Sequence, residues 1–323
     1  MKPLLLPLLR ELADSRFHSG EVLARTLGVS RATIWQLLTD AEALGVRVFR
    51  VPRRGYRLES PIDLLDAGVV AGQAGARSPF RLLLLDSIDS TNTYLLARAA
   101  DGAPHGSVVA AELQTGGRGR QGRPWLTGLA GALTFSVLWR FAAGVAGLSG
   151  LSLAVGLAVA RACDELGVAD VRVKWPNDVT HSGRKLAGTL IEVQGEMQGP
   201  SLAVIGIGIN HRIPPHVLAE IDQPVTDLAA IADPLPSRNI VLATVLRHVG
   251  AALAQFEASG FAPLVGEWEA RHAFQKKPVR LSLPDRTSVQ GIAEGVTPEG
   301  ALKVRAATGL MRFNVGEVSL RAA

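Results

Sequence analysis

The sequence predicts an α+β protein in three parts: an N-terminal winged helix-turn-helix, a central mixed α/β domain and a C-terminal SH3-like β-barrel. A helix, a glycine turn and a second helix come first. Strands and helices alternate in the middle, and short strands separated by Pro, Gly and Asp turns come last. The length of 323 residues, 47% of them apolar, is enough for two or three domains. We place the boundaries at residues 1–60, 61–80 for a linker, 81–272 and 273–323.

The first 60 residues have the pattern of a winged helix-turn-helix. Helices are predicted over residues 4–13, 21–27 and 31–44, and strands over residues 46–51 and 55–58. Ser19 and Ser30 precede the last two helices and can cap them. Gly28 makes the tight turn between these helices, and Gly45 ends the second. The hairpin that follows, the wing, carries five arginines.

This module is basic. It holds ten Lys or Arg and six Asp or Glu, a net charge of +4, while the whole chain carries +5. A basic terminal module indicates a polyanion partner, and the second helix of such a module enters the DNA major groove. Winged helices also serve as protein contacts or spacers, and Trp35 makes this second helix less polar than many DNA readers. We expect DNA contacts from six residues: Ser30, Arg31, Thr33, Gln36, Arg53 and Arg54.

The central region alternates strands and helices. Strands are predicted over residues 82–85, 107–112, 133–139, 171–174, 185–193 and 202–210, and helices over 93–100, 147–162, 238–259 and 266–272. Ser90, Thr91 and Asn92 open the first of these helices, where they can cap it or hold a ligand. Gly206 and Gly208 alternate along an apolar strand, which permits close approach of a ligand or another backbone.

An arginine-glycine loop, residues 116–125 (GGRGRQGRPW), is the strongest candidate for a binding site. Glycine lets main-chain N–H groups approach a ligand, and arginine adds paired donors for phosphate or carboxylate. Its glycines also match the dinucleotide pattern G-x-G-x-x-G. That pattern requires a following helix and an acidic residue about 20 positions on. A strand follows here, and no acid occurs between Glu112 and Asp164, so we reject a Rossmann site. A hairpin with merely solvated arginines stays possible on this pattern alone.

The remaining features limit the class of protein. Five short strands are predicted over residues 279–283, 288–293, 302–306, 311–314 and 317–321. The single Cys163 rules out an internal disulfide and favours the cytoplasm; its apolar surroundings indicate a core residue. The seven histidines lack zinc-ligand spacing. No run of 18 apolar residues occurs and the leucine-rich start lacks a cleavage site, so we expect neither a membrane span nor a signal peptide.

Five motifs occur in the order and spacing of the biotin–protein ligases: DSTN (89–92), GGRGRQGRPW (116–125), KWPND (174–178), KLAG (185–188) and GIGIN (206–210). With the helix-turn-helix in front, the chain resembles the bifunctional class known as biotin operon repressors. The resemblance covers essentially the whole chain and implies a catalytic domain of the biotin/lipoate ligase type. The paired GRGR and KWPND elements favour biotin over lipoate.

The resemblance implies a two-step reaction. Biotin and ATP, with Mg²⁺, form biotinyl-5′-adenylate, and biotin then passes to a lysine of biotin carboxyl carrier protein, a subunit of acetyl-CoA carboxylase. The adenylate-loaded protein would dimerise and repress biotin-synthesis genes at operator DNA. Two alternatives stay open: a ligase with a vestigial DNA module, and a repressor that uses the adenylate only as corepressor.

Site residues follow from the motifs, position by position. The resemblance implies catalysis by Lys185, Arg118 and Asp178, with Asn177 and Asp178 orienting Lys185 or a Mg²⁺ ion. Biotin or the adenylate would be bound by Ser90, Thr91, Asn92, Gln114, Gly117, Arg118, Gly119, Arg120, Trp125, Lys185, Gly188, Gly206 and Asn210. Two regions depart from the family pattern. Residues 211–225 offer no aromatic residue to stack on adenine, and the exposed residues of the recognition helix differ from those of the best-known repressor.

Overall fold

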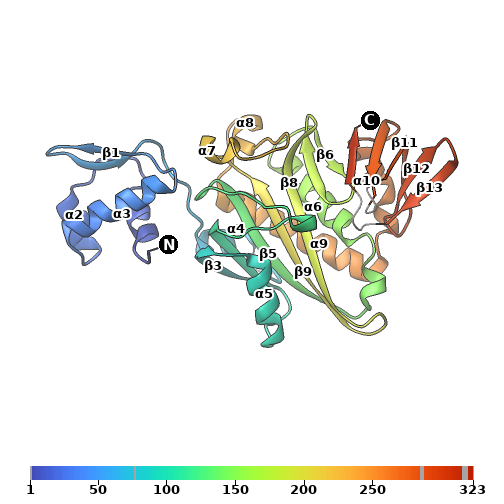
Figure 1. The fold of residues 1–323 in the computed structure, drawn as a ribbon. Helices are drawn as coiled ribbons and strands as arrows, with labels where there is room; N and C mark the ends of the chain where they lie inside the picture. Colours follow the sequence, from blue (N-terminus) through green and yellow to red (C-terminus); the bar gives the residue numbers. More distant parts are fainter. Residues whose placement is uncertain (1, 76–77, 284–286, 315–318, 323) are drawn as a thin grey trace.

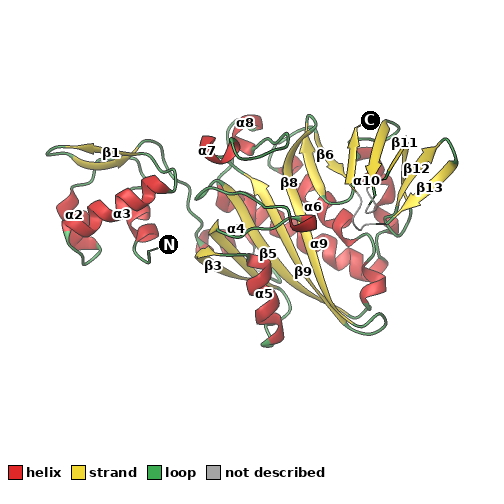
Figure 2. Ribbon diagram, in the orientation of Figure 1, coloured by secondary structure: helices red, strands yellow, loops and turns green. Residues whose placement is uncertain are grey.

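The computed structural model describes residues 2–75, 78–283, 287–314 and 319–322. Figure 1 shows three parts in chain order: a small helical module with a hairpin, a large sheet with helices, and a small sheet near the C-terminus. Figure 2 shows the same arrangement by secondary structure, with strands forming the centre of the molecule. The predicted fold class is confirmed.

The N-terminal module has the predicted elements. They are α1 (Leu5–Glu11), α2 (Gly20–Thr26), α3 (Arg31–Ala43), β1 (Val48–Val51) and β2 (Gly55–Leu58). Both predicted caps form, because the Oγ atoms of Ser19 and Ser30 accept the backbone N–H of Val22 and Thr33, each at 3.1 Å. Gly28 and Gly45 have φ of +65° and +84°, a conformation that glycine adopts without strain.

The central sheet has seven strands in the order β3-β4-β5-β9-β8-β7-β6. Only β3 and β4 run parallel; the other neighbours are antiparallel, which makes the sheet mixed as predicted. The strands are β3 (Arg81–Ile88), β4 (Ser107–Gln114), β5 (Ala132–Phe141), β6 (Val171–Lys174), β7 (Asp178–His181), β8 (Arg184–Gly195) and β9 (Ser201–Asn210). Strand β7 was not predicted, because its four residues lie between two turns and carry no recognisable alternation.

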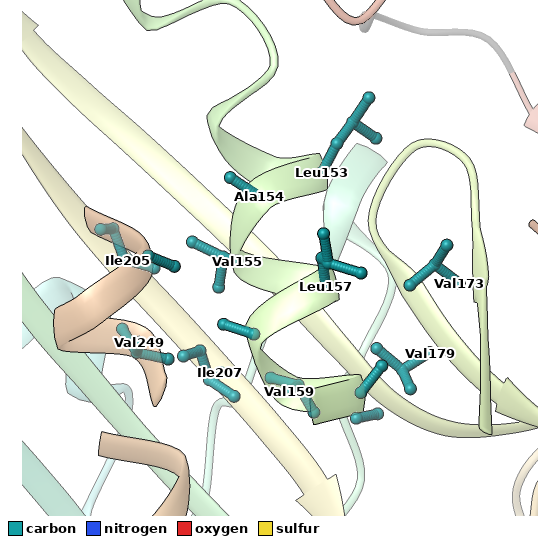
Figure 3. Packing of buried hydrophobic residues seen from close by; sticks show 14 of the residues in the cluster. Leu153, Ala154, Val155, Leu157, Val159, Val173, Val179, Ile205, Ile207 and Val249 are labelled. Atoms are coloured by element: carbon teal, nitrogen blue, oxygen red, sulfur yellow. The ribbon is translucent and has the colours of Figure 1, made fainter. Parts of the chain in front are cut away.

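The two faces of this sheet differ. Ile205 and Ile207 of β9 belong to the large core with α6 (Leu151–Glu165) and α9 (Arg238–Ser259), as Figure 3 shows. Val204 packs instead with Leu95 of α5 (Thr91–Ala100) on the opposite face. Side chains alternate along a strand, so neighbouring residues serve the two faces. The α5 face is thinly covered and leaves room for polar residues.

Two segments meet the length and composition test for membrane-crossing helices, Val145–Glu165 and Arg238–Ser259. In each, 67% of the apolar window is buried inside the protein. Both are core helices of the large cluster, and Cys163 is buried in one of them. Burial raises the pKa of the Cys163 thiol to about 12, which fits the predicted core role.

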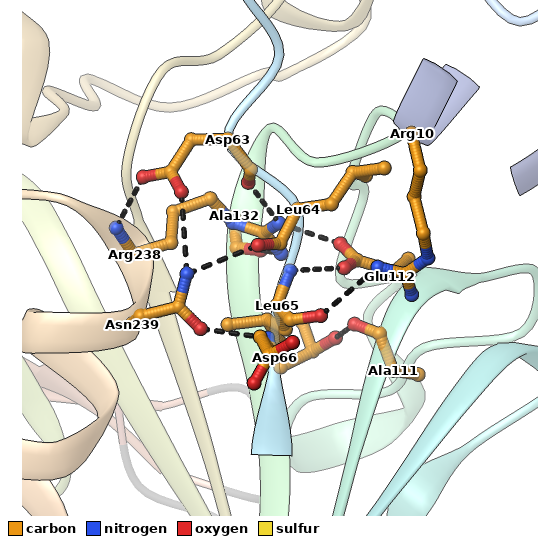
Figure 4. Close-up of polar contacts among 11 residues, drawn as sticks. Arg10, Asp63, Leu64, Leu65, Asp66, Ala111, Glu112, Ala132, Arg238 and Asn239 are labelled. Carbon is orange, nitrogen blue, oxygen red and sulfur yellow. Dashed lines mark hydrogen bonds and ion pairs between the residues drawn. The ribbon is translucent and has the colours of Figure 1, made fainter. Parts of the chain in front are cut away.

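The structure differs from the prediction of a linker over residues 61–80. This segment contains a helix, α4 (Ala67–Ala74), which Asp66 caps and which packs on α9. The residues just before this helix bind a buried ion pair between Arg238 and Glu112, shown in Figure 4. Glu112 accepts the backbone N–H of Leu65, and Arg238 donates to the carbonyl oxygen of Asp63 at 2.7 Å. The chain between the modules is therefore bound to the central domain.

Among the described residues, three short α-helices and five strands remain. They are α7 (Pro215–Leu218), α8 (Leu228–Ile231), α10 (Val265–Arg271), β10 (Pro278–Ser282), β11 (Ser288–Val296), β12 (Leu302–Ala306), β13 (Gly309–Phe313) and β14 (Ser319–Ala322). The last five form one antiparallel sheet in the order β13-β12-β11-β10-β14. Residues 317–318 of the last predicted strand lie outside the described residues.

Candidate functional site

Glycines on the α5 face of the sheet let side chains of the predicted site pack directly on the strands. Gly188 of β8 pairs with Gly208 of β9, and Gly206 pairs with Ser136 of β5. A Cβ at Gly206 would lie 2.3 Å from Asn92 Oδ1, and one at Gly208 would lie 2.4 Å from the Trp125 indole. The close neighbours of these glycines are thus side chains of the predicted site, rather than another backbone.

The first turn of α5 brings four predicted binding residues together. Ser90 caps the helix by accepting the Thr93 N–H at 3.3 Å. Thr91 donates its backbone N–H and its hydroxyl to Gln114 Oε1, at 2.8 and 3.0 Å. Asn92 donates to Glu192 Oε2 at 2.7 Å. Ser90, Thr91 and Asn92 are all buried, so these bonds fix the first turn of α5 against the sheet.

The arginine-glycine loop, called the lid from here on, folds as a hairpin. The Trp125 N–H donates to the Gly117 carbonyl at 2.9 Å, and the Gly119 N–H donates to the Arg123 carbonyl at 2.7 Å. The turn lies at Gln121 and Gly122, which have φ of +57° and +69°. In Figure 1 it extends from β4 across the front of the sheet. Strand, hairpin and strand confirm the rejection of a Rossmann site.

The two candidate arginines of the lid point to different places. Arg118 donates to Thr93 Oγ1 at 3.0 Å and lies 3.6 Å from Glu192 Oε1. Arg120 donates to Asn177 Oδ1 at 3.4 Å. Burial lowers the pKa of the Arg120 guanidinium, and the charge of Asp178 opposes this shift. Arg120, which we had grouped only with the binding residues, is therefore the one that faces the Asn177–Asp178 pair.

Lys185 is held by contacts on several sides. Its Nζ lies 2.6 Å from Asp178 Oδ1 and 5.4 Å from the centroid of the Trp125 ring. Its backbone N–H donates to Pro224, and its carbonyl accepts from Thr226 and, at 3.3 Å, from Asn210 Nδ2. A Cβ at Gly188 would come within 3.0 Å of the lysine Nζ. Gly188 and Asn210 thus help to place Lys185.

The geometry around Asp178 does not suit a metal ligand. Lys174 Nζ lies 3.7 Å from Oδ2 while Lys185 occupies Oδ1, so both carboxylate oxygens face ammonium groups. Asn177 uses its amide nitrogen to donate to the Thr189 carbonyl at 2.7 Å. Among the residues that the structure describes, no group of three His, Cys, Asp or Glu could hold a metal ion. The predicted Mg²⁺ role of Asn177 and Asp178 finds no support in this arrangement.

A cavity of about 290 Å³ continues from this site toward the C-terminal sheet. Arg120 and Asn177 line its inner side, and Glu299, Gly300 and Asn314 line its outer side. The Trp175 indole N–H donates to the Gly300 carbonyl at 3.1 Å and holds the two domains together here. The C-terminal domain thus forms part of the wall beside the lid.

The loop after β9, residues 211–225, has two parts: Pro224 binds the Lys185 backbone, whereas Pro214 and His216 pack elsewhere. A Cβ at Gly128 or Gly131 would come within 3 Å of the Pro214 ring, which therefore packs against the end of the β4–β5 connection. The His216 imidazole lies against Gly45, at the end of α3. As expected from its sequence, the loop presents no Phe, Tyr or Trp to a base.

The predicted DNA-contact residues fall into two groups. Ser30 and Thr33 bond to each other at 2.9 Å, so both hydroxyls serve the helix cap. The second group is Arg31, Gln36, Arg53 and Arg54, whose side chains are exposed, as Ser30 also is. Trp35, a residue we had counted against DNA binding, is 52% exposed on α3, and Arg50 lies 5.9 Å from its ring centroid.

Several site residues were missed from the sequence. Glu192 and Ser136 bind the first turn of α5, and Lys174 shares Asp178 with Lys185. Lys174 stands in the KWPND motif and was given no role. Ser136 and Glu192 interrupt apolar strands, a recognisable signal, because polar residues inside strands seldom face a core without a partner.

Comparison with known proteins gives three domain matches. Residues 84–210 match the biotin/lipoate A/B protein ligase family, residues 5–57 an HTH domain, and residues 277–321 the biotin protein ligase C-terminal domain. The chain is 39% identical to the bifunctional ligase/repressor BirA of Escherichia coli strain K12, over 98% of this chain and 97% of that protein.

Two further proteins are similar over about three quarters of the chain. The biotin–[acetyl-CoA-carboxylase] ligase of Mycobacterium tuberculosis is 36% identical, over 76% of this chain and 91% of that protein. The solved biotin protein ligase of Aquifex aeolicus, in complex with biotin and ATP, aligns with a TM-score of 0.64 at 29% identity. It covers 75% of this chain and 99% of its own.

Proposed function

This chain belongs to the bifunctional biotin ligase/repressor family, and we propose that it activates biotin with ATP and transfers it to a lysine of a biotin carboxyl carrier protein. The observation that carries the proposal is Lys185, held between Asp178 and Trp125 beside a lid that carries three arginines. A fixed ammonium and a guanidinium suit a reaction that joins a carboxylate to a phosphate.

In the first step, a biotin carboxylate oxygen attacks the α-phosphorus of ATP. The acyl carbon and the α-phosphorus become joined through that oxygen in a mixed anhydride. The bond between the α-phosphorus and the oxygen that bridges to the β-phosphate breaks, and pyrophosphate leaves. Negative charge grows on the α-phosphate oxygens during the step. Lys185 and Arg120 are the cations that we assign to stabilise it, since Lys185 binds Asp178 and Arg120 binds the neighbouring Asn177.

In the second step, the amine of the carrier lysine attacks the acyl carbon. An amide bond forms, the bond to the phosphate oxygen breaks, AMP leaves, and the amine loses a proton. The mixed anhydride reacts readily with water, so the lid has to cover it between the steps. Trp125, which lies over Gly208, is the apolar side chain that we assign to this task.

Other parts of the proposal depend on the family more than on the geometry. Mg²⁺ would enter with ATP, held by phosphates and water, because the described residues provide no cage for it. We further propose a cytoplasmic protein that takes its carrier from acetyl-CoA carboxylase and dimerises when it holds the adenylate.

The deciding experiment incubates the protein with biotin, ATP, Mg²⁺ and a carrier domain, and follows the carrier by mass spectrometry. We expect the mass gain of one biotinyl group on one lysine. A matched reaction contains lipoate instead of biotin. If the carrier gains mass only with lipoate, or with neither acid, the assignment is wrong.

The lid arginines are expected to differ in effect. Arg120→Ala should slow adenylate formation about a hundredfold, because it removes a charge near Asp178. Arg118→Ala should change this step much less and chiefly let the adenylate escape, because Arg118 binds Thr93 and Glu192. Pyrophosphate release measures the first effect, and adenylate found in the filtrate after rapid ultrafiltration measures the second. Equal effects of the two substitutions on pyrophosphate release would contradict this division.

A second function, repression through operator DNA, is supported by the exposed basic wing. Arg53 and Arg54 are exposed, and Arg53 has a φ of +66° at the tip of the hairpin. A gel shift on the promoter of the biotin genes, with and without biotinyl-adenylate, tests it. A shift that needs the adenylate supports a repressor; no shift supports a vestigial module; a shift without carrier labelling supports a repressor that is no ligase.

The double substitution Arg53→Ala, Arg54→Ala should weaken DNA binding about equally on all sequences. Each lost phosphate contact reduces the slope of log K against log salt by about one, so the expected reduction is about two. Fluorescence anisotropy over a salt series measures the slope. Carrier labelling by the same variant should be unchanged, and an unchanged slope would show that the wing does not contact phosphates.

A further inference from the structure

Glu192 is a carboxylate that lies next to a site for anions. It stands on β8, where Glu192 pairs with Val204, Leu190 with Gly206 and Gly188 with Gly208. Alternation along the strand therefore puts Glu192 on the same face as Gly206 and Gly208, which Asn92 and Trp125 cover. A negative charge here would disfavour biotin carboxylate and phosphate unless a protein cation neutralised it.

That cation comes from the lid. Arg118 Nη2 lies 3.6 Å from Glu192 Oε1 and donates to Thr93 Oγ1 at 3.0 Å. The other carboxylate oxygen of Glu192 accepts from Asn92 Nδ2 at 2.7 Å. Asn92 in turn accepts from Ser136 at 2.6 Å and lies over Gly206. One carboxylate thus joins the lid to the first turn of α5.

We infer that Glu192 is a positioning residue that holds the lid closed through Arg118 and so retains the biotinyl-adenylate until the carrier lysine arrives. Its role is exerted on protein side chains, since both of its oxygens have protein partners. Thr93 is the second half of the anchor, because it binds the same guanidinium nitrogen. The inference rests on the proposed ligase function.

The geometry limits the size of the effect. The Arg118 and Glu192 side chains are 49% and 32% exposed, and partly exposed ion pairs contribute modestly. We therefore expect Glu192→Gln to speed adenylate release about threefold to fivefold. The rate of pyrophosphate release should stay within about twofold, because the charges near Asp178 are untouched.

The sign of the change separates two roles for Glu192. If its charge acted on the ligand directly, Glu192→Gln would remove a repulsion and slow adenylate release. If Glu192 holds the lid, the same substitution speeds release. Thr93→Val, which removes a bond to Arg118 without changing any charge, should speed release as well, and Arg118→Gln combined with Glu192→Gln should be no faster than Arg118→Gln alone.

The experiment loads the full-length protein with radiolabelled biotin and ATP, removes free ligand, and follows loss of label after a chase of unlabelled biotin. Glu165→Gln is the matched control, because Glu165 of α6 pairs with Arg247 and His248 of α9, on the opposite face of the sheet from α5. Faster release in the Glu192 and Thr93 variants, with non-additivity toward Arg118, supports the proposal. Release at the wild-type rate, slower release or additive effects would overturn it. Failure of the wild-type protein to form labelled adenylate would instead refute the ligase function.

Discussion

Lys185→Met is expected to slow biotinyl-adenylate formation about a hundredfold to a thousandfold, the largest loss of activity that the site predicts. One preorganised charge at the developing negative charge contributes about 3–4 kcal/mol to the transition state. Lys185 is preorganised because Asp178 binds its ammonium group at 2.6 Å and the 224–226 segment holds its backbone. Biotin-dependent pyrophosphate release under saturating ATP measures the rate.

Lys174→Met provides the comparison for this prediction. The Lys174 ammonium group also faces the Asp178 carboxylate, at a longer distance of 3.7 Å. Its substitution therefore removes the same charge from the same region as Lys185→Met. We expect it to slow adenylate formation less than about tenfold, because its ion pair is looser. If the two lysine variants lose the same activity, general positive charge is what matters and the specific role of Lys185 is wrong.

Arg238→Met is expected to lower the stability of the central domain by about 3–5 kcal/mol. The Arg238 and Glu112 side chains are 1% and 4% exposed. Arg238 also donates to the Asp63 and Ala132 carbonyls, at 2.7 and 3.0 Å. Removing it leaves a buried carboxylate without its partner, which costs more than a lost surface pair.

Thermal unfolding measures this effect, with an expected fall in Tm of roughly 10 °C for a domain of this size. Arg247→Met is the matched control, because it breaks a surface ion pair with Glu165 in which both side chains are 45% exposed. That control should cost less than about 1 kcal/mol. Adding Glu112→Met to Arg238→Met should cost less than the sum of the single changes, because the unpaired charge disappears. A Tm for Arg238→Met close to that of the control would contradict the prediction.

Most elements could be predicted because their signals are local. The caps at Ser19 and Ser30, the turn at Gly28 and the apolar spacing of α9 each depend on residues within a few positions. Strand β7 escaped prediction because four residues between turns show no period. Helix α4 escaped because its glycines suggested a linker, and its packing on α9 outweighs their low helix propensity.

The candidate site divides in the same way. The motifs placed Ser90, Gln114 and Lys185 in one region, and the structure does bring them to one face of the sheet. The motifs did not distinguish Arg118 from Arg120, which are two residues apart in one loop. Their partners, Thr93 and Asn177, lie 25 and 57 positions away.

The sequence by itself determined the three-part organisation, the identity of the motif residues and the basic character of the N-terminal module. Tertiary structure alone decided which residues contact each other. Arg120 binds Asn177 beside Asp178, and Glu192 pairs with Arg118. Arg238 pairs with Glu112, which lies 126 positions away in the sequence. The physical reason is the range of the interactions. Caps, turns and periodicity are set by neighbours in the chain. Ion pairs between distant segments depend instead on the sheet register and on how the lid lies over the sheet.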